Sequence, residues 1–244
     1  MDRLLERQSV SPQWDIASLN ARFETSGTRR LIETVLAENP GGRVATVSSF
    51  GSNSVVLLHL VANIDPTLPV LLVDTGKLFP ATLQYREEMT ARLGLTNVAT
   101  IKADRGTLSA HDQRGALWMQ NRDACCALRK VAPLADVLES VDIWLSGRKR
   151  YQGGSRKQLP LFEADGSRLK INPLAGWTSG DIDIYRNAFG LPQHPLVAEG
   201  YRSIGCEPCT TPVLAGEDER AGRWRDSEKS ECGIHGQFEN GGGI

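Results

Sequence analysis

The five cysteines of this chain fall into three short motifs that could do chemistry. Cys125 and Cys126 stand in tandem within RDACCALRK, and Cys206 and Cys209 form a C-x-x-C pair within GCEPC. The C-x-x-C spacing suits a redox dithiol, half of a zinc site or part of an iron–sulfur site. Consecutive side chains diverge, so the tandem pair fits one tetrahedral zinc ion poorly but could reach two irons of a larger cluster. We therefore favour a 4Fe–4S cluster held by these four thiolates over zinc or disulfides.

The fifth cysteine, Cys232, lies in SECGIHG, just before a polar, glycine-rich end, FENGGGI. A structural thiol is expected in an apolar strand or helix, whereas this one stands far from any expected core. Such a thiol is a candidate nucleophile on a flexible tail, and His235 could help to form its thiolate. The alternatives are an incidental exposed thiol and a loop histidine with no role.

A serine-rich stretch, SSFGSNS at residues 48–54, joins an expected strand directly to an expected helix. Backbone amides at a helix amino terminus, together with serine hydroxyls, form a good cradle for an oxyanion. The stretch is neither a Walker loop nor a dinucleotide-binding G-x-G-x-x-G motif. A strand-to-helix turn with serine caps is the simpler interpretation. The candidate phosphate ligands are Ser48, Ser49, Phe50, Gly51 and Ser54.

The elements that must position these motifs alternate between strands and helices. Helices are expected at 28–38, 54–64, 79–94 and 178–190, with Thr178 and Asp181 capping the last. Apolar strands are expected around 43–50, 69–76, 98–104, 141–147 and 169–174. This alternation predicts an α/β fold, a mainly parallel sheet with helices on both faces. Ligands bind outside the carboxyl ends of such strands, which selects the loops 48–54, 73–76 and 146–156.

Length and composition limit the class of protein. The 244 residues fit a single domain, which we divide into an N-terminal helical extension (1–27), an α/β nucleotide-binding core (28–191), a cluster-binding and arginine loop (192–227) and a flexible tail (228–244). The formal charge of −1 argues against nucleic acid and membrane partners. The chain begins without a secretory signal and has no apolar run long enough to span a bilayer, so we expect a cytoplasmic protein. A homo-oligomer remains open.

The motifs together resemble one family, the assimilatory sulfonucleotide reductases, and within it the adenosine 5′-phosphosulfate (APS) reductases. The matches are S-F-G-x-x-S, V-D-T-G, C-C-x-x-R-K, G-C-E-P-C, ERAGRW and E-C-G-I-H, in that order from about residue 43 to 235. The resemblance implies a PP-loop fold of the adenine-nucleotide alpha-hydrolase type. It implies reduction of APS to sulfite and AMP, with a 4Fe–4S cluster on the four paired cysteines. It also implies that Cys232 is the nucleophile, that it passes through an S-sulfocysteine intermediate, and that thioredoxin or a similar dithiol protein supplies electrons.

The resemblance also implies which polar side chains meet the substrate. The candidates for its phosphate and sulfate groups are Lys130, Arg150, Gln152, Arg156, Arg220 and Arg223. Lys130 could also link the cluster to bound substrate, while Asp74 and Thr75 are expected beside the adenosine. For each of these cations the alternative is a solvated surface charge, which is how we interpret Arg148 and Lys149.

The chain departs from the family pattern in three places. Phe50 and Asn53 stand where the usual S-G-G-x-D-S loop has a glycine and an aspartate, and Thr211 stands where relatives often carry a basic residue. Loops with that aspartate cleave ATP, so its absence indicates a different adenylylated compound. Three alternatives stay open: a reductase of the 3′-phosphorylated substrate (PAPS) or of both substrates, a PP-loop tRNA thiolase, and a non-enzymatic zinc module.

Overall fold

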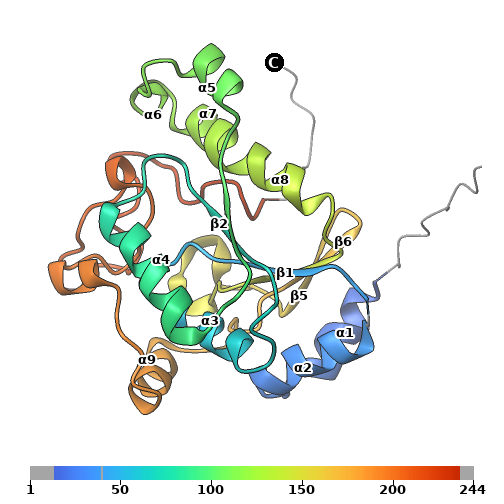
Figure 1. Cartoon of the computed structure of the whole chain (residues 1–244). Coiled ribbons are helices and arrows are strands. Elements are labelled where there is room, and N and C mark those ends of the chain that lie inside the picture. Colours follow the sequence, from blue (N-terminus) through green and yellow to red (C-terminus); the bar gives the residue numbers. More distant parts are fainter. Residues whose placement is uncertain (1–13, 40, 237–244) are drawn as a thin grey trace, which may run out of the picture.

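The computed structural model describes residues 14–39 and 41–236, and within them a six-stranded sheet forms the centre of the molecule (Figure 1). The strands are β1 (Val44–Val47), β2 (Val70–Val73), β3 (Val98–Ile101), β4 (Ile143–Ser146), β5 (Phe162–Asp165) and β6 (Arg168–Ile171). They lie in the order β3-β2-β1-β4-β6-β5, and every neighbouring pair is parallel except β5 with β6. The predicted α/β fold with a mainly parallel sheet is confirmed.

One strand of this sheet was missing from the sequence prediction. β5 pairs antiparallel with β6 through a two-residue turn, in which Gly166 takes a φ of 61°. Its sequence, FEAD, carries two acidic residues and lacks the apolar run that marks the other strands. The signal that could have revealed it is the Gly-Ser pair at 166–167, which is typical of a two-residue hairpin turn.

The helices cover both faces of the sheet, as predicted. Their bounds are α1 (Ile16–Phe23), α2 (Thr28–Glu38), α3 (Ser54–Ala62), α4 (Pro80–Leu93), α5 (Arg105–His111), α6 (Leu117–Gln120), α7 (Arg122–Cys126), α8 (Ala132–Leu138) and α9 (Ser179–Ala188). Buried residues of α1 to α4 and α9 share one apolar cluster, whereas those of α8 belong to a second cluster. In Figure 1, α8 and α3 accordingly lie on opposite sides of the strands.

Several helix ends follow directly from the sequence. Pro80 begins α4 without losing a backbone hydrogen bond, and Gly94 ends it in the left-handed conformation, with a φ of 66°. The Thr178 hydroxyl accepts a hydrogen bond from the Asp181 amide, and the Asp181 carboxylate accepts one in return from the Thr178 amide. This capping box was predicted and is confirmed.

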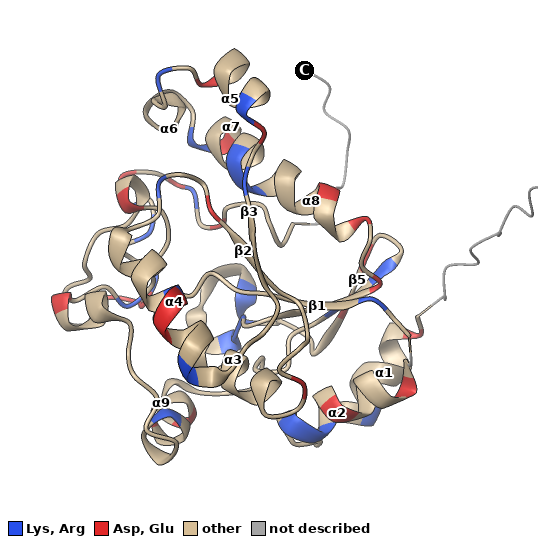
Figure 2. Cartoon of the chain, viewed as in Figure 1, with Lys and Arg blue, Asp and Glu red and all other residues tan. Residues whose placement is uncertain are grey.

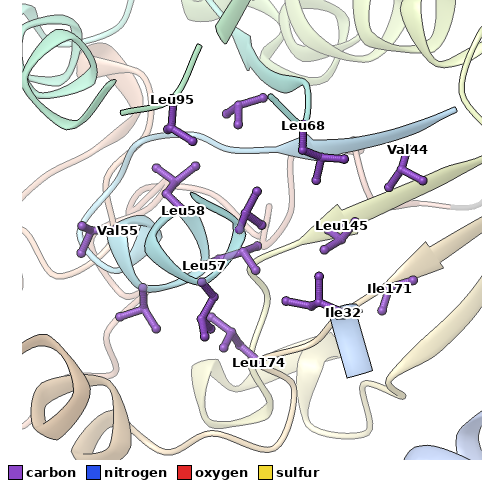
Figure 3. Packing of buried hydrophobic residues seen from close by; sticks show 14 of the residues in the cluster. Ile32, Val44, Val55, Leu57, Leu58, Leu68, Leu95, Leu145, Ile171 and Leu174 are labelled. Carbon is purple, nitrogen blue, oxygen red and sulfur yellow. The ribbon is translucent and has the colours of Figure 1, made fainter. Parts of the chain in front are cut away.

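The core follows the two-residue period of the strands. Val44, Leu145 and Ile171 point into the larger cluster, shown in Figure 3, together with the apolar α3 helix. Their neighbours Ala45 and Trp144 point to the other face, toward α8. Since side chains alternate between the faces of a strand, both faces of these central strands must be apolar. That requirement explains the continuous hydrophobic runs in the sequence.

Strand order reverses between β1 and β4. From β1 the chain proceeds outward through β2 to β3, then returns to β4 on the other side of β1. The loops after β1 and β4 therefore diverge and leave a crevice at the carboxyl edge of the sheet. No helix among the described residues is long and apolar enough to cross a membrane. Residues 1–13 of the expected N-terminal extension and 237–244 of the expected tail lie outside the described residues.

Candidate active site

A cavity of about 200 Å³ occupies this crevice. The serine-rich loop and the loop after β4 line two of its sides, and residues 202–205, 220–224 and 231–235 close the others. Eleven sequence-predicted site residues line it: Ser48, Ser49, Gly51, Ser54, Lys130, Gln152, Arg156, Arg220, Arg223, Cys232 and His235. Phe50, Asp74, Thr75 and Arg150 are not among the lining residues. Segments far apart in the sequence thus converge where the topology of the sheet predicts a ligand.

The serine-rich loop is held in shape by its own hydroxyls. The Phe50 amide donates to Ser48 Oγ at 3.2 Å, and the Gly51 amide donates to Ser54 Oγ at 2.9 Å. Phe50 takes a positive φ of 47°, the conformation that suits a glycine, which is the residue that the usual motif has there. Its side chain is fully buried in the larger apolar cluster. Burial of the ring therefore compensates for the backbone strain, and Phe50 acts in the loop through its backbone.

The loop after β4 carries two cations whose predicted exposure was wrong. Lys149 is buried and Arg148 is half-buried, and both line the cavity. Arg148 pairs with Glu163, while the Lys149 ammonium donates to the Gly147 carbonyl at 2.8 Å. Burial lowers the pKa of Lys149 to about 8. Arg150, by contrast, points away and donates to the Leu159 carbonyl at 2.7 Å.

Arg156 and Arg220 are joined by one carboxylate, Glu231, that was not among the predicted site residues. Both oxygens of Glu231 accept hydrogen bonds from Arg156, at 2.6 and 2.9 Å, and Arg220 lies 3.1 Å from one of them. Gln152 Oε1 accepts a further hydrogen bond from Arg156 at 2.5 Å. The side chains of Arg156 and Arg220 are only 10% and 16% exposed, so this is a partly buried ion cluster.

Lys130 and Arg223 lie between the cavity and the paired cysteines. Lys130 follows α7 within a π-helical turn, Ala127–Val131, and is 8% exposed. Burial opposes its charge, but Cys206 and Cys232 outweigh burial and raise the pKa of Lys130. Arg223 stacks on Trp224 at 4.4 Å, and its buried Nε has no hydrogen-bond partner among the described residues. Figure 2 shows that cations and carboxylates are mixed on the outer helices, so the excess of positive charge is local to this cavity.

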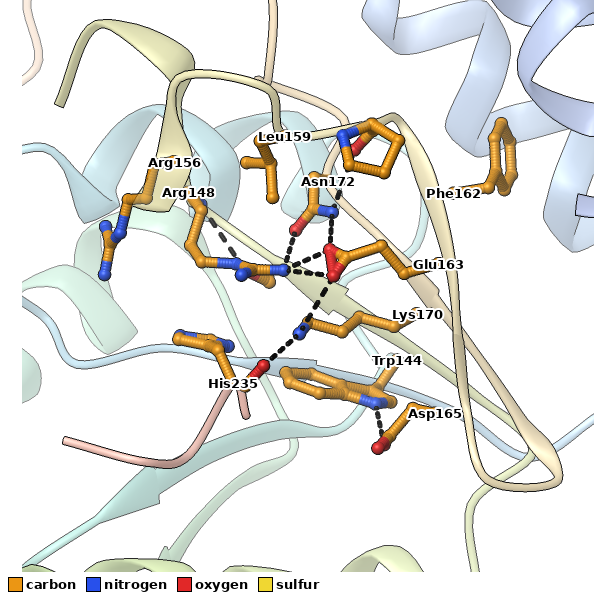
Figure 4. A network of polar contacts seen from close by, with 12 residues as sticks. Trp144, Arg148, Arg156, Leu159, Phe162, Glu163, Asp165, Lys170, Asn172 and His235 are labelled. Atoms are coloured by element: carbon orange, nitrogen blue, oxygen red, sulfur yellow. Dashed lines mark hydrogen bonds and ion pairs between the residues drawn. The ribbon is translucent and has the colours of Figure 1, made fainter. Parts of the chain in front are cut away.

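The tail segment up to Gly236 is packed onto the sheet, contrary to the expectation that Cys232 lies far from a core. Ile234 packs against the α8-side cluster, and the His235 ring stacks on Trp144 with centroids 5.7 Å apart (Figure 4). Cys232 is half-buried between them and the ion cluster of Glu231. This packing could not be predicted locally, because the aromatic partner, Trp144, belongs to a strand about 90 residues earlier. The second face of the sheet near β4 is therefore covered by the tail.

The stacked His235 rests on a buried polar network (Figure 4). The Lys170 ammonium donates to the His235 carbonyl at 3.3 Å, lies 4.9 Å from the Trp144 ring and pairs with Glu163 at 3.4 Å. Burial lowers the pKa of His235 well below its usual value, and the nearby cations, Arg148 among them, lower it further. His235 is thus a neutral imidazole at physiological pH, and its buried Nδ1 lacks a hydrogen-bond partner among the described residues.

The four paired cysteines line a second, smaller cavity beside the first. Cys125 and Cys126 reach it from α7, and Cys206 and Cys209 from the loop that follows residue 205. None forms a disulfide. Burial raises the pKa of Cys126 to about 11, although Lys130 opposes the rise. Among the described residues no group of three or more His, Cys, Asp or Glu side chains is arranged to hold a metal ion.

Asp74 and Thr75 lie near these cysteines and do not line the larger cavity where the adenosine was expected. Thr75 Oγ1 is 3.2 Å from Cys206 Sγ, and Asp74 pairs with Lys102 at 3.1 Å. The Thr75 carbonyl also accepts a hydrogen bond from Arg129, a buried arginine that is paired with Asp112 at 2.6 Å. The turn after β2 therefore supports the cysteine cavity, a role that the sequence did not reveal.

Comparisons with known proteins identify the family. The model of the phosphoadenosine phosphosulfate reductase domain matches residues 43–212. The chain belongs to this family. It is 49% identical to the adenosine 5′-phosphosulfate reductase of Mesorhizobium japonicum, over 90% of this chain and 86% of that protein. It is 37% identical to the phosphoadenosine 5′-phosphosulfate reductase of Photobacterium profundum, over 95% of this chain and 92% of the relative. The predicted membership of the sulfonucleotide reductases is confirmed.

A solved structure extends the comparison to the fold. The phosphoadenylyl-sulfate reductase of Candida auris, solved as a phosphate complex, superposes with a TM-score of 0.67 at 22% identity. The match covers 81% of this chain and 96% of that chain. At this identity the likeness supports the PP-loop type of fold, which confirms the predicted architecture.

Proposed function

We propose that this chain reduces adenosine 5′-phosphosulfate to sulfite and AMP in assimilatory sulfate reduction, with Cys232 as the nucleophile. The observation that carries the proposal is that Cys232 lines an anion-binding cavity at the point where the strand order reverses. Seven basic side chains line the same cavity, against one carboxylate. A thiol in such surroundings meets an anionic substrate at the place where the cations gather.

The cavity offers complementary groups to each part of this substrate. Leu57, Leu58, Leu72 and Val73 form an apolar wall suited to adenine. The serine-rich loop suits the phosphate, because it brings hydroxyls and backbone amides to the start of α3. Lys130 and Arg223 line the cavity together with Cys232 and suit the sulfo group and the phosphate that leaves from it.

The chemistry divides into two displacement steps at sulfur. The Cys232 thiolate attacks the sulfo sulfur with its electron pair, and the bond from that sulfur to the phosphate oxygen breaks. AMP leaves with the bonding electrons, and S-sulfocysteine remains. A thiolate of a dithiol protein such as thioredoxin then attacks the Cys232 sulfur and forms a mixed disulfide, while sulfite leaves with the electron pair. The second thiol of the donor completes its disulfide and returns Cys232, so the donor supplies both electrons.

His235 serves this sequence as a neutral side chain. Its lowered pKa keeps a further cation out of the site and makes the ring a poor proton acceptor at physiological pH. The stacking on Trp144 fixes the ring at the end of the segment that carries Cys232. We therefore assign His235 to shielding the closed site.

The proposed cofactor is one 4Fe–4S cluster, held by Cys125, Cys126, Cys206 and Cys209. Four thiols, three buried and Cys209 half-buried, are free of disulfides and line one cavity, which is the donor set that such a cluster requires. The thiolates of a cluster bind different irons, so a site for a single metal ion is not needed. When bound, the cluster supplies local charge and structure next to Lys130. Because the thiol chemistry transfers electrons in pairs, we assign the cluster no redox step.

A direct test separates this activity from its nearest alternative, reduction of PAPS, which the Photobacterium profundum relative favours. Anaerobically purified enzyme with reduced thioredoxin should release sulfite from APS far faster than from PAPS. Cys232→Ser should abolish release from either nucleotide while binding AMP normally. Iron and acid-labile sulfide should each approach four per chain. Equal rates with PAPS would indicate dual specificity, and full activity of Cys232→Ser would refute the nucleophile.

A further inference from the structure

Glu231 is an acid in a cavity built for anions. It is the one carboxylate among the described residues that line this cavity. The basic residues lining it are Lys130, Arg148, Lys149, Arg156, Arg202, Arg220 and Arg223. A carboxylate in this cavity competes with an anionic substrate for the cations, so its presence there indicates a different role.

The contacts of Glu231 tie three segments together. Arg156 comes from the loop after β4 and binds both carboxylate oxygens, which is the strong bidentate arrangement. Arg220 precedes the tail, binds one of the same oxygens and also donates to the Ser230 carbonyl at 2.6 Å. Burial alone would raise the pKa of Glu231, but these arginines outweigh it and hold the pKa below its usual value. Glu231 is thus ionised and held from two sides.

Cys232 immediately follows this clamp. The next residue, Gly233, has a φ of 92°, which other residues rarely adopt, so the chain turns sharply after Cys232. The cavity still has free cations, because Lys130, Lys149 and Arg223 have no carboxylate within ion-pair distance in the described part of the chain. The substrate can therefore bind to these cations without displacing Glu231. This favours a role for Glu231 as a latch that holds the tail closed, rather than as a competitor of the substrate for the arginines.

We propose that Glu231 is a positioning residue whose clamp by Arg156 and Arg220 keeps the tail closed, with the Cys232 thiol inside the cavity. The inference rests on the proposed function, because it gives Glu231 its effect through the nucleophile. Opening of the clamp exposes Cys232 to the electron donor, and closing it brings Cys232 to the substrate. Glu231 itself touches no reacting atom.

The test compares Glu231→Gln with Glu228→Gln in the anaerobically purified holoenzyme. Glu228 is a suitable control because it is exposed on the same segment and forms no ion pair with another described residue. Cleavage after Lys229 yields the peptide 230–244, in which Cys232 is the only cysteine. Alkylation of Cys232 by iodoacetamide can therefore be followed by mass spectrometry of this peptide. Single-turnover formation of S-sulfocysteine from APS and the affinity for AMP are measured alongside.

Loss of charge-assisted hydrogen bonds predicts about tenfold faster alkylation of Cys232 in Glu231→Gln and about tenfold slower adduct formation. AMP affinity should stay within about twofold, since the remaining cations bind the nucleotide. Glu228→Gln should match the wild type in all three measurements. An unchanged alkylation rate in Glu231→Gln would overturn the proposed latch. Tighter AMP binding with normal adduct formation would show instead that Glu231 competes with the nucleotide for the arginines. Failure of the wild type to form any adduct would refute the proposed function separately, because alkylation reports tail closure without substrate.

Discussion

Substitution of Gly205 by alanine should weaken nucleotide binding by displacing Arg223. The added methyl carbon would lie 2.2 Å from Arg223 Nη2, 2.4 Å from Cζ and 2.6 Å from Nη1. Ordinary contact begins at 3.4 Å, so the guanidinium must retreat by 3.4 − 2.2, or about 1.2 Å. A shift of that size breaks a hydrogen bond to a phosphate or sulfo oxygen.

The loss of one such charge-assisted bond is worth about 1.5–3 kcal/mol. AMP affinity in Gly205→Ala should therefore fall about 10- to 100-fold. The free energy of unfolding should change by less than about 1 kcal/mol, because the displaced atoms are the end of a flexible side chain. Calorimetric titration with AMP and urea unfolding measure the two quantities.

A double-mutant cycle decides whether the effect passes through Arg223. In an Arg223→Lys background, the alanine substitution should have little further effect on AMP affinity, because the atoms that it displaces are gone. Gly27→Ala is a control, since a methyl carbon there meets nothing within 4 Å. Unchanged AMP affinity in Gly205→Ala, or fully additive effects in the cycle, would show that Arg223 is not the group through which the substitution acts.

Three further predictions concern stability and the cofactor. Glu163→Gln should lower the free energy of urea unfolding by about 3 kcal/mol, because it leaves the buried Arg148 and Lys170 without their carboxylate; an unchanged midpoint would contradict this. Burial lowers the pKa of His194 to about 4, so the unfolded chain binds more protons between that value and 6.5. Stability should be fully present above pH 6.5 and fall by up to about 3 kcal/mol as pH drops to 4, a slope that His194→Gln should flatten. Cys209→Ser should lower iron content and the visible absorbance of anaerobically purified protein, and full retention of iron would exclude Cys209 as a ligand.

The sequence was informative wherever one segment determines its own conformation. Apolar runs predicted five of the six strands, and the Pro80, Gly94 and Thr178 signals located helix ends. These features depend on local backbone chemistry, which the residue types encode directly. The edge strand β5 was missed because its FEAD sequence lacks such a signal.

The candidate site was only partly predictable, because its contacts join distant segments. The order of motifs indicated that Cys232 and the arginines share one site, yet the burial of Lys149 left no trace in the local sequence. Nor could the sequence reveal that the Trp144 ring stacks on His235. It was equally silent on the ion pairs of Glu231 with Arg156 and Arg220. Each of these pairings is set by the packing of the tail on the sheet.

The role of Cys232 as nucleophile can be tested by following the sulfo group. Anaerobically purified enzyme is mixed with APS in the absence of a reductant, digested after Lys229, and the 230–244 peptide is analysed by mass spectrometry. We expect one sulfo group on Cys232 for each AMP released, and its loss as sulfite when reduced thioredoxin is added. Sulfite released at a normal rate while the Cys232 peptide never carries the group would contradict this role.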